Sequence, residues 1–342
     1  SQIAKGIAQA QKNLEPAQVG WGVGRDEKNV ASRRWLMKPG VAPTNPYVGR
    51  TGDLAQMHPG YGNPSAIRPT GPVDSSVPVL AIRTARGEPL AVLTNYSMHY
   101  VGKPALSADY FSLVCDQMTK LLGAENRKPA FVAIHSNGTS GDAWLMDYTK
   151  PRREFTPEGV AQDVAQAAFD ALHGIQYYRW APIVMEESLL SVGVRMPTAE
   201  EVARAREFMQ TFADRKPKDT NEVYARETVL LSEMPATREL RLQAIRIGDF
   251  GIAAIPNETF GSTGLAIKAA SPTKVTMNIE LANGCEGYLP PPDQLELGGY
   301  ETWRARTSCL DDKAEPAIRT TLIGLLENVA RARSGEPSRK AD

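Results

Sequence analysis

The sequence has few cysteines, no long hydrophobic run and no excess of charge, and each of these absences excludes a class of protein or partner. Its 342 residues include three cysteines, whose spacings match no zinc finger. No apolar run reaches the roughly 18 residues that a bilayer-spanning helix needs, so no transmembrane segment is predicted. With 39 basic and 39 acidic side chains the formal charge is zero, which argues against nucleic acid as the main partner. A small-molecule or lipid-like substrate is expected instead.

The cysteines leave the cellular compartment open. Three cysteines fit an intracellular chain and equally an exported chain with one disulfide bond. Cys285 and Cys309 can be bridged if their Cα atoms lie within about 7 Å of each other. A free pair fits the sequence equally well.

Apolar periodicity predicts helices and strands that alternate along much of the chain. Strands are expected at 17–24, 77–84, 89–97, 128–136, 182–194 and 274–284, with the second and third forming a hairpin, and with another hairpin over 241–258 turned at Gly248 and Asp249. Helices are expected at 1–11, 108–122, 156–172, 198–212, after Glu258, and at 312–333.

These elements predict an α/β fold, a layered sandwich of mixed β-sheets with outer helices, because strands outnumber those of a simple alternating βαβ chain. No linker divides the chain, so residues 1–333 are expected to form one domain, followed by a polar tail over 334–342. Residues 38–78 are rich in Pro, Gly and Asn and are expected to form a long loop that serves as a lid or binding wall. The charges of the helical region 213–239 are expected on the surface.

Polar residues that can bind or react follow three buried strands. They lie in NYSMHY at 95–100, SNGTSGD at 136–142 and IPNE at 255–258, and a fourth, glycine-rich segment covers 283–301. Histidine, glutamate and tyrosine from separate strand ends are suitable zinc donors. Spacing alone does not distinguish a metal-binding His99 from a hydrogen-bonded structural histidine.

The segments NYSMHYVG, LSADY, SNGTSGD, AAIPNE and NGCEGYLPPPDQLELGGYE, in this order, resemble the catalytic domain of the neutral/alkaline non-lysosomal ceramidase family, and most closely its bacterial members. The motifs are spread from about residue 18 to residue 308. Enzymes of this family are zinc-dependent amidases that split the N-acyl bond of a sphingolipid. The resemblance therefore implies a zinc cofactor and hydrolysis of a carbon–nitrogen bond.

The resemblance also implies roles for individual residues. The zinc ligands would be His99, Glu258 and Tyr288. Tyr300 matches a second active-site tyrosine, and Arg33 matches an active-site arginine, with Arg34 as the alternative assignment.

The sequence departs from the family in its histidines. Family members carry a further zinc histidine in an upstream His-x-His segment, which this sequence does not contain, and His58 is expected to be an ordinary loop residue. Either the chain is the C-terminal product of a cleaved precursor, whose N-terminal fragment supplies the zinc histidine, or the site is incomplete. On the first alternative, any export signal would belong to the N-terminal fragment.

A second departure concerns the nucleophile. Trp144 occupies the position of the family's serine, two residues after Gly141-Asp142, and it can form no covalent intermediate. This argues against ceramide as the substrate. Ser140 is the nearest candidate hydroxyl, and Asp142 is expected to orient a zinc ligand.

The sequence thus predicts a zinc-dependent hydrolase of the neutral ceramidase type that cleaves an amide or related acyl bond with a metal-activated water. Two alternatives stay open: a catalytically degenerate ceramidase-like protein that binds a lipid or glycan, and a serine esterase that uses Ser140. No Gly-x-Ser-x-Gly elbow surrounds Ser140. A periplasmic or secreted location is expected from the resemblance.

Overall fold

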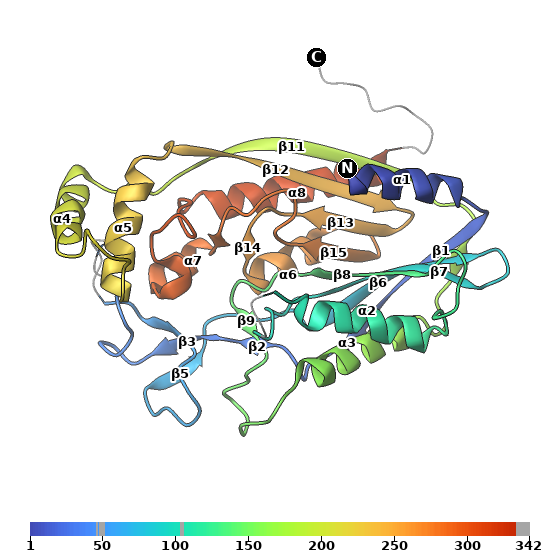
Figure 1. The fold of residues 1–342 in the computed structure, drawn as a ribbon, viewed down its shortest axis with the longest axis horizontal. Coiled ribbons are helices and arrows are strands. Elements are labelled where there is room, and N and C mark those ends of the chain that lie inside the picture. The colour runs from blue at the N-terminus through green and yellow to red at the C-terminus, as the bar shows by residue number, and fades with distance from the viewer. Residues whose placement is uncertain (46, 48–51, 103–105, 333–342) are drawn as a thin grey trace, which may run out of the picture.

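The computed structural model describes residues 1–45, 47, 52–102 and 106–332 (Figure 1). Its helices are α1 Gln2–Lys12, α2 Asp109–Leu121, α3 Pro157–Ala171, α4 Ala199–Gln210, α5 Thr220–Ser232, α6 Gly261–Ala270, α7 Pro292–Leu297, the 3₁₀ turn η1 Tyr300–Thr302 and α8 Ala314–Arg331. Its strands are β1 Ala17–Arg25, β2 Ala31–Ser32, β3 Arg34–Met37, β4 Ala55–Met57, β5 Ala66–Pro69, β6 Ser76–Thr84, β7 Pro89–Tyr96, β8 Val132–Asn137, β9 Ala143–Trp144, β10 Tyr177–Tyr178, β11 Ile183–Gly193, β12 Thr237–Ile247, β13 Phe250–Ala254, β14 Glu258–Thr259, β15 Val275–Ile279 and β16 Tyr288–Leu289.

Two main sheets stack face to face, with helices on the outside. One has the strand order β10-β1-β6-β7-β8 and the other β11-β12-β13-β15. The side chains of Leu80, Phe250, Ile252 and Met277 pack between them. The helices α2 and α3 cover the first sheet and α8 covers the second. Each sheet has one parallel pair, and no sheet of the described residues closes into a barrel, so the predicted layered sandwich of mixed sheets is confirmed.

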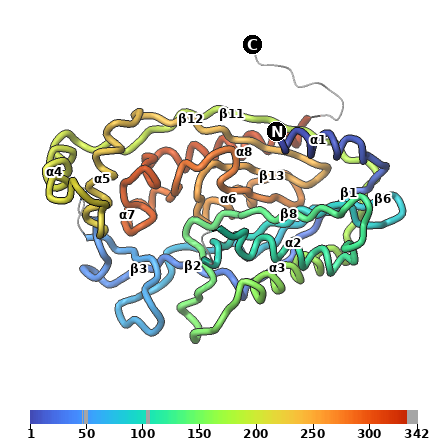
Figure 2. The backbone as a smooth tube through the Cα atoms, in the orientation of Figure 1, coloured from blue at the N-terminus to red at the C-terminus, as the bar shows by residue number. Residues whose placement is uncertain are grey.

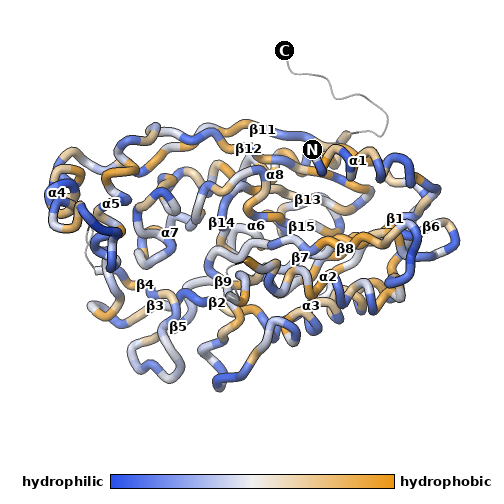
Figure 3. The backbone as a smooth tube through the Cα atoms, viewed as in Figure 1, coloured by the Kyte–Doolittle hydropathy of each residue, from blue (hydrophilic) through white to orange (hydrophobic). Residues whose placement is uncertain are grey.

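The two halves of the chain build the two halves of the sandwich. Figure 2 shows the blue-to-green part of the backbone forming the first sheet with α2 and α3, and the yellow-to-red part forming the second sheet with α8. Hydrophobic residues occur along β1 and β8 (Figure 3). In the part of the chain that the structure describes, no helix is long and apolar enough to cross a membrane.

Alternating glycines allow α3 to lie directly on β1. Gly20, Gly22 and Gly24 share one face of the strand because successive residues of a strand point to opposite sides. A Cβ atom on Gly22 would lie 2.6 Å from the carbonyl oxygen of Ala171, and one on Gly24 would overlap the carbonyl oxygen of Ala167. The sequence AQVGWGVG therefore specifies the helix packing as well as the strand.

Most predicted elements are present. The hairpins over 77–97 and 241–258 are β6–β7 and β12–β13, and the turn glycine Gly248 has φ of 61°. Thr198 and Glu201 form the expected capping box at the start of α4. Cys285 and Cys309 are both free, which settles the alternative that the sequence left open. The predicted tail 334–342 lies outside the described residues.

Two expectations are wrong. Residues 38–78 are not a continuous loop, because β4 and β5 pair with β3 in a small antiparallel sheet. The charges of 213–239 are not all on the surface: Glu222 and Glu227 are buried and are held by Arg215 and Arg306. In both places contacts between distant residues override a locally polar sequence.

We expect Gly24→Ala to lower the free energy of unfolding by about 1–3 kcal/mol, because the new methyl group must displace α3. Gly6→Ala is the matched control: Gly6 lies within α1 with no atom near its missing Cβ, so alanine there should raise stability by up to about 1 kcal/mol. Urea denaturation of the three proteins measures both effects. Equal midpoints for Gly24→Ala and the wild type would contradict the packing argument.

Candidate functional site

The loops that follow β7, β8, β13 and β15 meet at one edge of the sandwich. Within each sheet the two strands concerned are parallel neighbours, so they end on the same side. The loops are joined by backbone hydrogen bonds: the N–H of Gly141 donates to the carbonyl of Thr259 at 2.8 Å, and that of Glu280 to Asn137 at 3.1 Å. Three polar segments that lie far apart in the sequence thereby become neighbours.

The buried carboxylate of Glu280 connects the two sheets at this edge. Its Oε2 accepts the backbone N–H groups of Thr259 at 2.8 Å and Ser140 at 3.1 Å. Its Oε1 accepts the Ser140 hydroxyl at 2.6 Å and the Asn137 amide at 2.9 Å. Burial raises the pKa of Glu280 to about 8, against the opposite effect of these donors.

Ser140 and Asp142 both serve the backbone of this region. Ser140 is completely buried and its hydroxyl is bound to Glu280, so it lacks the access that a nucleophile needs. Asp142 accepts the N–H of Gly261 at 2.8 Å, at the start of α6, and burial raises its pKa to about 6. The geometry gives both residues structural partners and places neither against His99.

His99 and Glu258 face each other across the site. Nε2 of His99 lies 4.0 Å from Oε2 of Glu258, and the two side chains are 17% and 20% exposed. Burial, together with the positive charge of Arg33, lowers the pKa of His99 to about 3, so its imidazole is neutral at neutral pH. Burial raises the pKa of Glu258, while a hydrogen bond from Tyr288 acts in the opposite direction.

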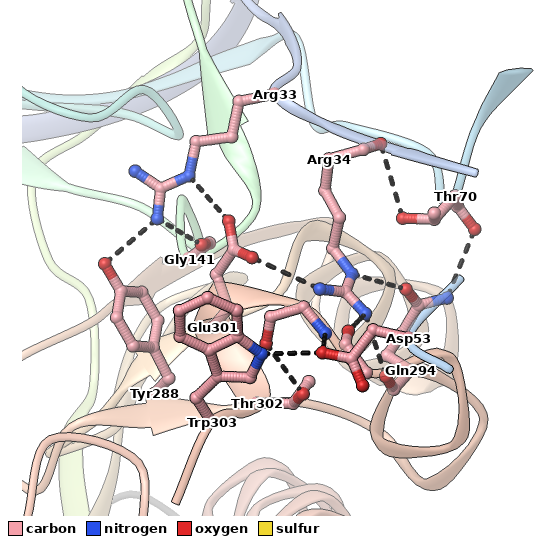
Figure 4. A network of polar contacts seen from close by, with 12 residues as sticks. Arg33, Arg34, Asp53, Thr70, Gly141, Tyr288, Gln294, Glu301, Thr302 and Trp303 are labelled. Atoms are coloured by element: carbon pink, nitrogen blue, oxygen red, sulfur yellow. Dashed lines mark hydrogen bonds and ion pairs between the residues drawn. The ribbon is translucent and has the colours of Figure 1, made fainter. Parts of the chain in front are cut away.

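Tyr288 is placed beside Glu258 by the short parallel pair β14–β16. Figure 4 shows its hydroxyl in contact with Arg33, whose Nη2 donates to it at 3.0 Å and to the carbonyl of Gly141 at 2.9 Å. Glu301, which is fully buried, binds Nε of Arg33 at 3.1 Å and holds the guanidinium in this orientation. Arg33 is thus a direct neighbour of the predicted ligands.

Arg34 points the other way, toward α7. Its guanidinium donates to the side chain of Gln294 at 3.1 Å, to Glu301 at 3.2 Å and to the carbonyl of Gly298 (Figure 4). It is fully buried and contacts none of the predicted zinc ligands. Of the two arginines, Arg33 is therefore the one that contacts Tyr288.

Tyr300 lies at the open side of the site. Its ring is edge-on to that of Tyr288, with 6.0 Å between centroids, and it is 40% exposed. Gly298 and Gly299 precede it with φ of 69° and 91°, conformations that glycine adopts readily. A Cβ on Gly299 would lie 2.7 Å from the carbonyl oxygen of Ala55, so the double glycine lets this turn approach β4.

The residues present fit a zinc ion. The neutral imidazole of His99, the Glu258 carboxylate and the Tyr288 oxygen are suitable donors, and Nε2 of His99 faces the carboxylate. Two tetrahedral zinc ligands at about 2.1 Å from the ion lie about 3.4 Å apart, so the 4.0 Å pair would have to close by about 0.6 Å to bind the ion. Among the described residues no three His, Cys, Asp or Glu side chains cluster as metal ligands, so the third donor would be a tyrosine.

His58 and Trp144 lie closer to the site than their positions in the sequence indicate. His58 follows β4 in a loop, as expected, but its backbone N–H binds the carbonyl of Arg33 at 2.7 Å, and its positive form would repel a protonated His99. Its ring lies edge-on to Trp144 at 4.8 Å, and Trp144 in turn donates to the carbonyl of Tyr100 at 2.9 Å. No local pattern in the sequence reveals these contacts.

Glu301 is a further residue that sequence reasoning missed. It lies next to Tyr300 in the GGYE segment, and its carboxylate bridges Arg33 and Arg34. The sequence signal for Glu301 was its position beside a predicted active-site tyrosine. The two adjacent arginines of the chain, Arg33 and Arg34, also need a negatively charged partner.

Comparisons with known proteins show the fold. No protein-family model and no curated protein matches the chain. The structure is similar to that of neutral ceramidase from Pseudomonas aeruginosa, with a TM-score of 0.60 and 15% identity over 99% of this chain and 56% of the other. It is also similar to a ceramidase complexed with C2, with a TM-score of 0.58 and 13% identity over 98% and 57%. The chain has the fold of these proteins over nearly its whole length and spans little more than half of theirs.

The buried Glu280 should make stability depend on pH. Because its pKa is raised to about 8 in the folded protein, the folded state holds a proton that the unfolded state releases near its ordinary pKa of about 4.5. The contribution of Glu280 to stability should therefore decrease as pH rises from about 4.5 to about 8, whereas buried histidines with a lowered pKa, such as His99, act in the opposite direction below about 6.5. Relative to the wild type and the exposed control Glu239→Gln, the urea midpoint of Glu280→Gln should therefore become more favourable as pH rises across this range. An unchanged slope in Glu280→Gln would refute the assignment.

Proposed function

We propose that this chain is a zinc-dependent hydrolase of the neutral ceramidase type that cleaves an amide or related acyl bond. The observation that carries the proposal is the His99–Glu258 pair, 4.0 Å apart, with the Tyr288 hydroxyl and the Arg33 guanidinium at the same point. The overall likeness to ceramidase structures supports the reaction class, since those proteins share this fold.

In this proposal His99, Glu258 and Tyr288 hold the metal. Zinc, when bound, lowers the pKa of a coordinated water from near 15.7 to about 7 and polarises a carbonyl group. The neutral state of His99 supports the assignment, because a protonated imidazole cannot ligate. Burial raises the pKa of Tyr288, while the charge of Arg33 and the hydrogen bond that it donates to the Tyr288 oxygen act in the opposite direction.

Two residues are proposed to act on the substrate. Tyr300 is half exposed beside Tyr288, and its phenol can donate a hydrogen bond to the oxyanion or a proton to the leaving group. Arg33 places a positive charge beside the same point, which stabilises negative charge that develops on the substrate. Asp142 is proposed to act indirectly: its carboxylate accepts the backbone N–H of Gly261 and so holds the first turn of α6.

The metal set calls for one more histidine in the ceramidase pattern, and we propose that a further fragment of the same precursor supplies it. The strand β8 is an edge of its sheet among the described residues and leaves Val132 and Ile134 half exposed, directly before the site loop. An additional strand could pair with this free edge, two strands away from β7, which leads to His99. A periplasmic or secreted location forms part of the same proposal.

The two other hypotheses have less support. A serine esterase would require Ser140 to reach the substrate, whereas its hydroxyl is buried against Glu280. A binding protein without catalysis would not need a neutral histidine, a carboxylate and a tyrosine together beside a buried arginine, although Trp144 replaces the serine expected from the resemblance.

For His99→Ala we expect loss of bound zinc and of hydrolytic activity, because the alanine removes the nitrogen donor. Metal analysis of the purified protein and turnover of a panel of N-acyl amides, with and without a chelator, measure the two effects. His173→Ala is the matched control, since His173 lies exposed beyond the end of α3. Wild-type zinc content in His99→Ala would reject the assignment.

For Ser140→Ala we expect a loss of stability of about 1–3 kcal/mol and only a few-fold loss of activity, because Glu280 loses one of its donors while the metal donors stay in place. Urea denaturation and the same amide panel provide the measurements. Complete inactivation with full zinc content would instead favour the serine esterase.

A further inference from the structure

A cavity of about 890 Å³ opens beside Tyr300, between α5 and the chain around residues 285–307. Tyr300 and Trp303 form one wall, and their rings meet edge-on with 6.3 Å between centroids. Because Tyr300 also contacts Tyr288, the cavity adjoins the predicted metal ligands. A substrate cleaved at that point would place part of its length here.

The walls of this cavity combine apolar and charged groups. Six of its sixteen lining residues carry a formal charge, namely Lys218, Asp219, Glu227, Arg238, Glu286 and Arg306. An apolar chain packed against these six would remove water from charged groups without replacing its hydrogen bonds. The part of a substrate that lies against the charged wall is therefore expected to be polar.

Two of the acidic groups already have partners. Glu227 receives two hydrogen bonds from Arg306, at 2.8 and 2.9 Å, in the bidentate arrangement typical of arginine and carboxylate. Asp219 caps α5 by accepting the N–H of Glu222 at 3.0 Å. Neither carboxylate therefore has both of its oxygens available to bind a cationic ligand.

Arg238, at the start of β12, has weaker contacts than these two acidic residues. Its Nη1 lies 3.6 Å from Glu286, beyond hydrogen-bond distance, and its Nη2 approaches the sulfur of Met234 at 3.5 Å. Its Nε is buried without a hydrogen-bond partner among the described residues, although the Cys309 thiol is nearby. The side chain is 24% exposed and lines the cavity. Arg238 is thus a partly buried guanidinium in a loose ion pair with Glu286, and its short-range hydrogen-bond capacity is incompletely used.

We propose that this cavity binds the carboxylate of an N-acyl amino acid, with Arg238 as its anchor and the amide toward Tyr300. The fork of an arginine matches a carboxylate bidentately, as Arg306 shows with Glu227 in the same cavity. The inference rests on the proposed function, because it takes the Tyr300 end of the cavity as the place of cleavage. It names the substrate class as anionic N-acyl amides rather than ceramide.

Cys285 provides a readout that does not depend on catalysis. It is exposed and lines the cavity, whereas Cys115 is partly buried and Cys309 is buried. A ligand in the cavity should slow the reaction of Cys285 with Ellman's reagent, and the variant Cys285→Ser identifies the signal. The probes are N-hexanoyl derivatives of glycine, 4-aminobutyrate and 6-aminohexanoate, each compared with its uncharged methyl amide.

We expect at least one acid to protect Cys285 about ten-fold more strongly than its methyl amide, and this preference to be lost in Arg238→Met and reduced in Arg238→Lys. Arg241→Met is the matched control, because Arg241 lies on the same strand, is exposed and binds Glu187. Equal protection by acids and amides, or an unchanged preference in Arg238→Met, would overturn the inference.

Turnover of the same probes separates the two proposals. Hydrolysis that shows no preference for the acids would refute the carboxylate site and leave the hydrolase intact. Protection that depends on Arg238, in a protein that hydrolyses none of the probes and binds no zinc, would support the carboxylate site and refute the hydrolase. His99→Ala should retain the protection and lose the hydrolysis.

Discussion

The buried carboxylate of Glu280 is the interaction on which the arrangement of the site depends. It leaves the second sheet at the end of β15 and accepts four hydrogen bonds from the loops after β8 and β13. A carboxylate buried in this way is costly unless its oxygens are satisfied, so it specifies one relative position of the loops. With those loops in place, His99 and Glu258 come within 4.0 Å of each other.

A second buried network orients the groups that would react. Glu301 neutralises two adjacent arginines that point in opposite directions, Arg33 toward Tyr288 and Arg34 toward α7. Removing one member of such a buried set would leave an uncompensated charge, so its geometry is strongly held. Arg33 can therefore serve both as a structural ion and as the positive charge beside the candidate metal ligands.

The fold and the substrate are separate questions in this molecule. The likeness to ceramidase structures, at 15% and 13% identity, establishes the scaffold, while activity belongs to particular side chains. Here Trp144 lies near the site, and the cavity beside Tyr300 has charged walls. The proposed preference for a polar amide therefore depends on these side chains and not on the fold.

Local chemistry in the sequence determined the helix caps and the hairpins, because these depend on residues a few positions apart. The order of the motifs also placed His99, Glu258 and Tyr288 together as candidates. Only the tertiary structure distinguished Arg33 from Arg34, buried Ser140 against Glu280 and brought His58 beside Trp144. Ser140 and Glu280 are 140 positions apart, and no local pattern encodes a contact between two buried polar groups that only sheet stacking creates.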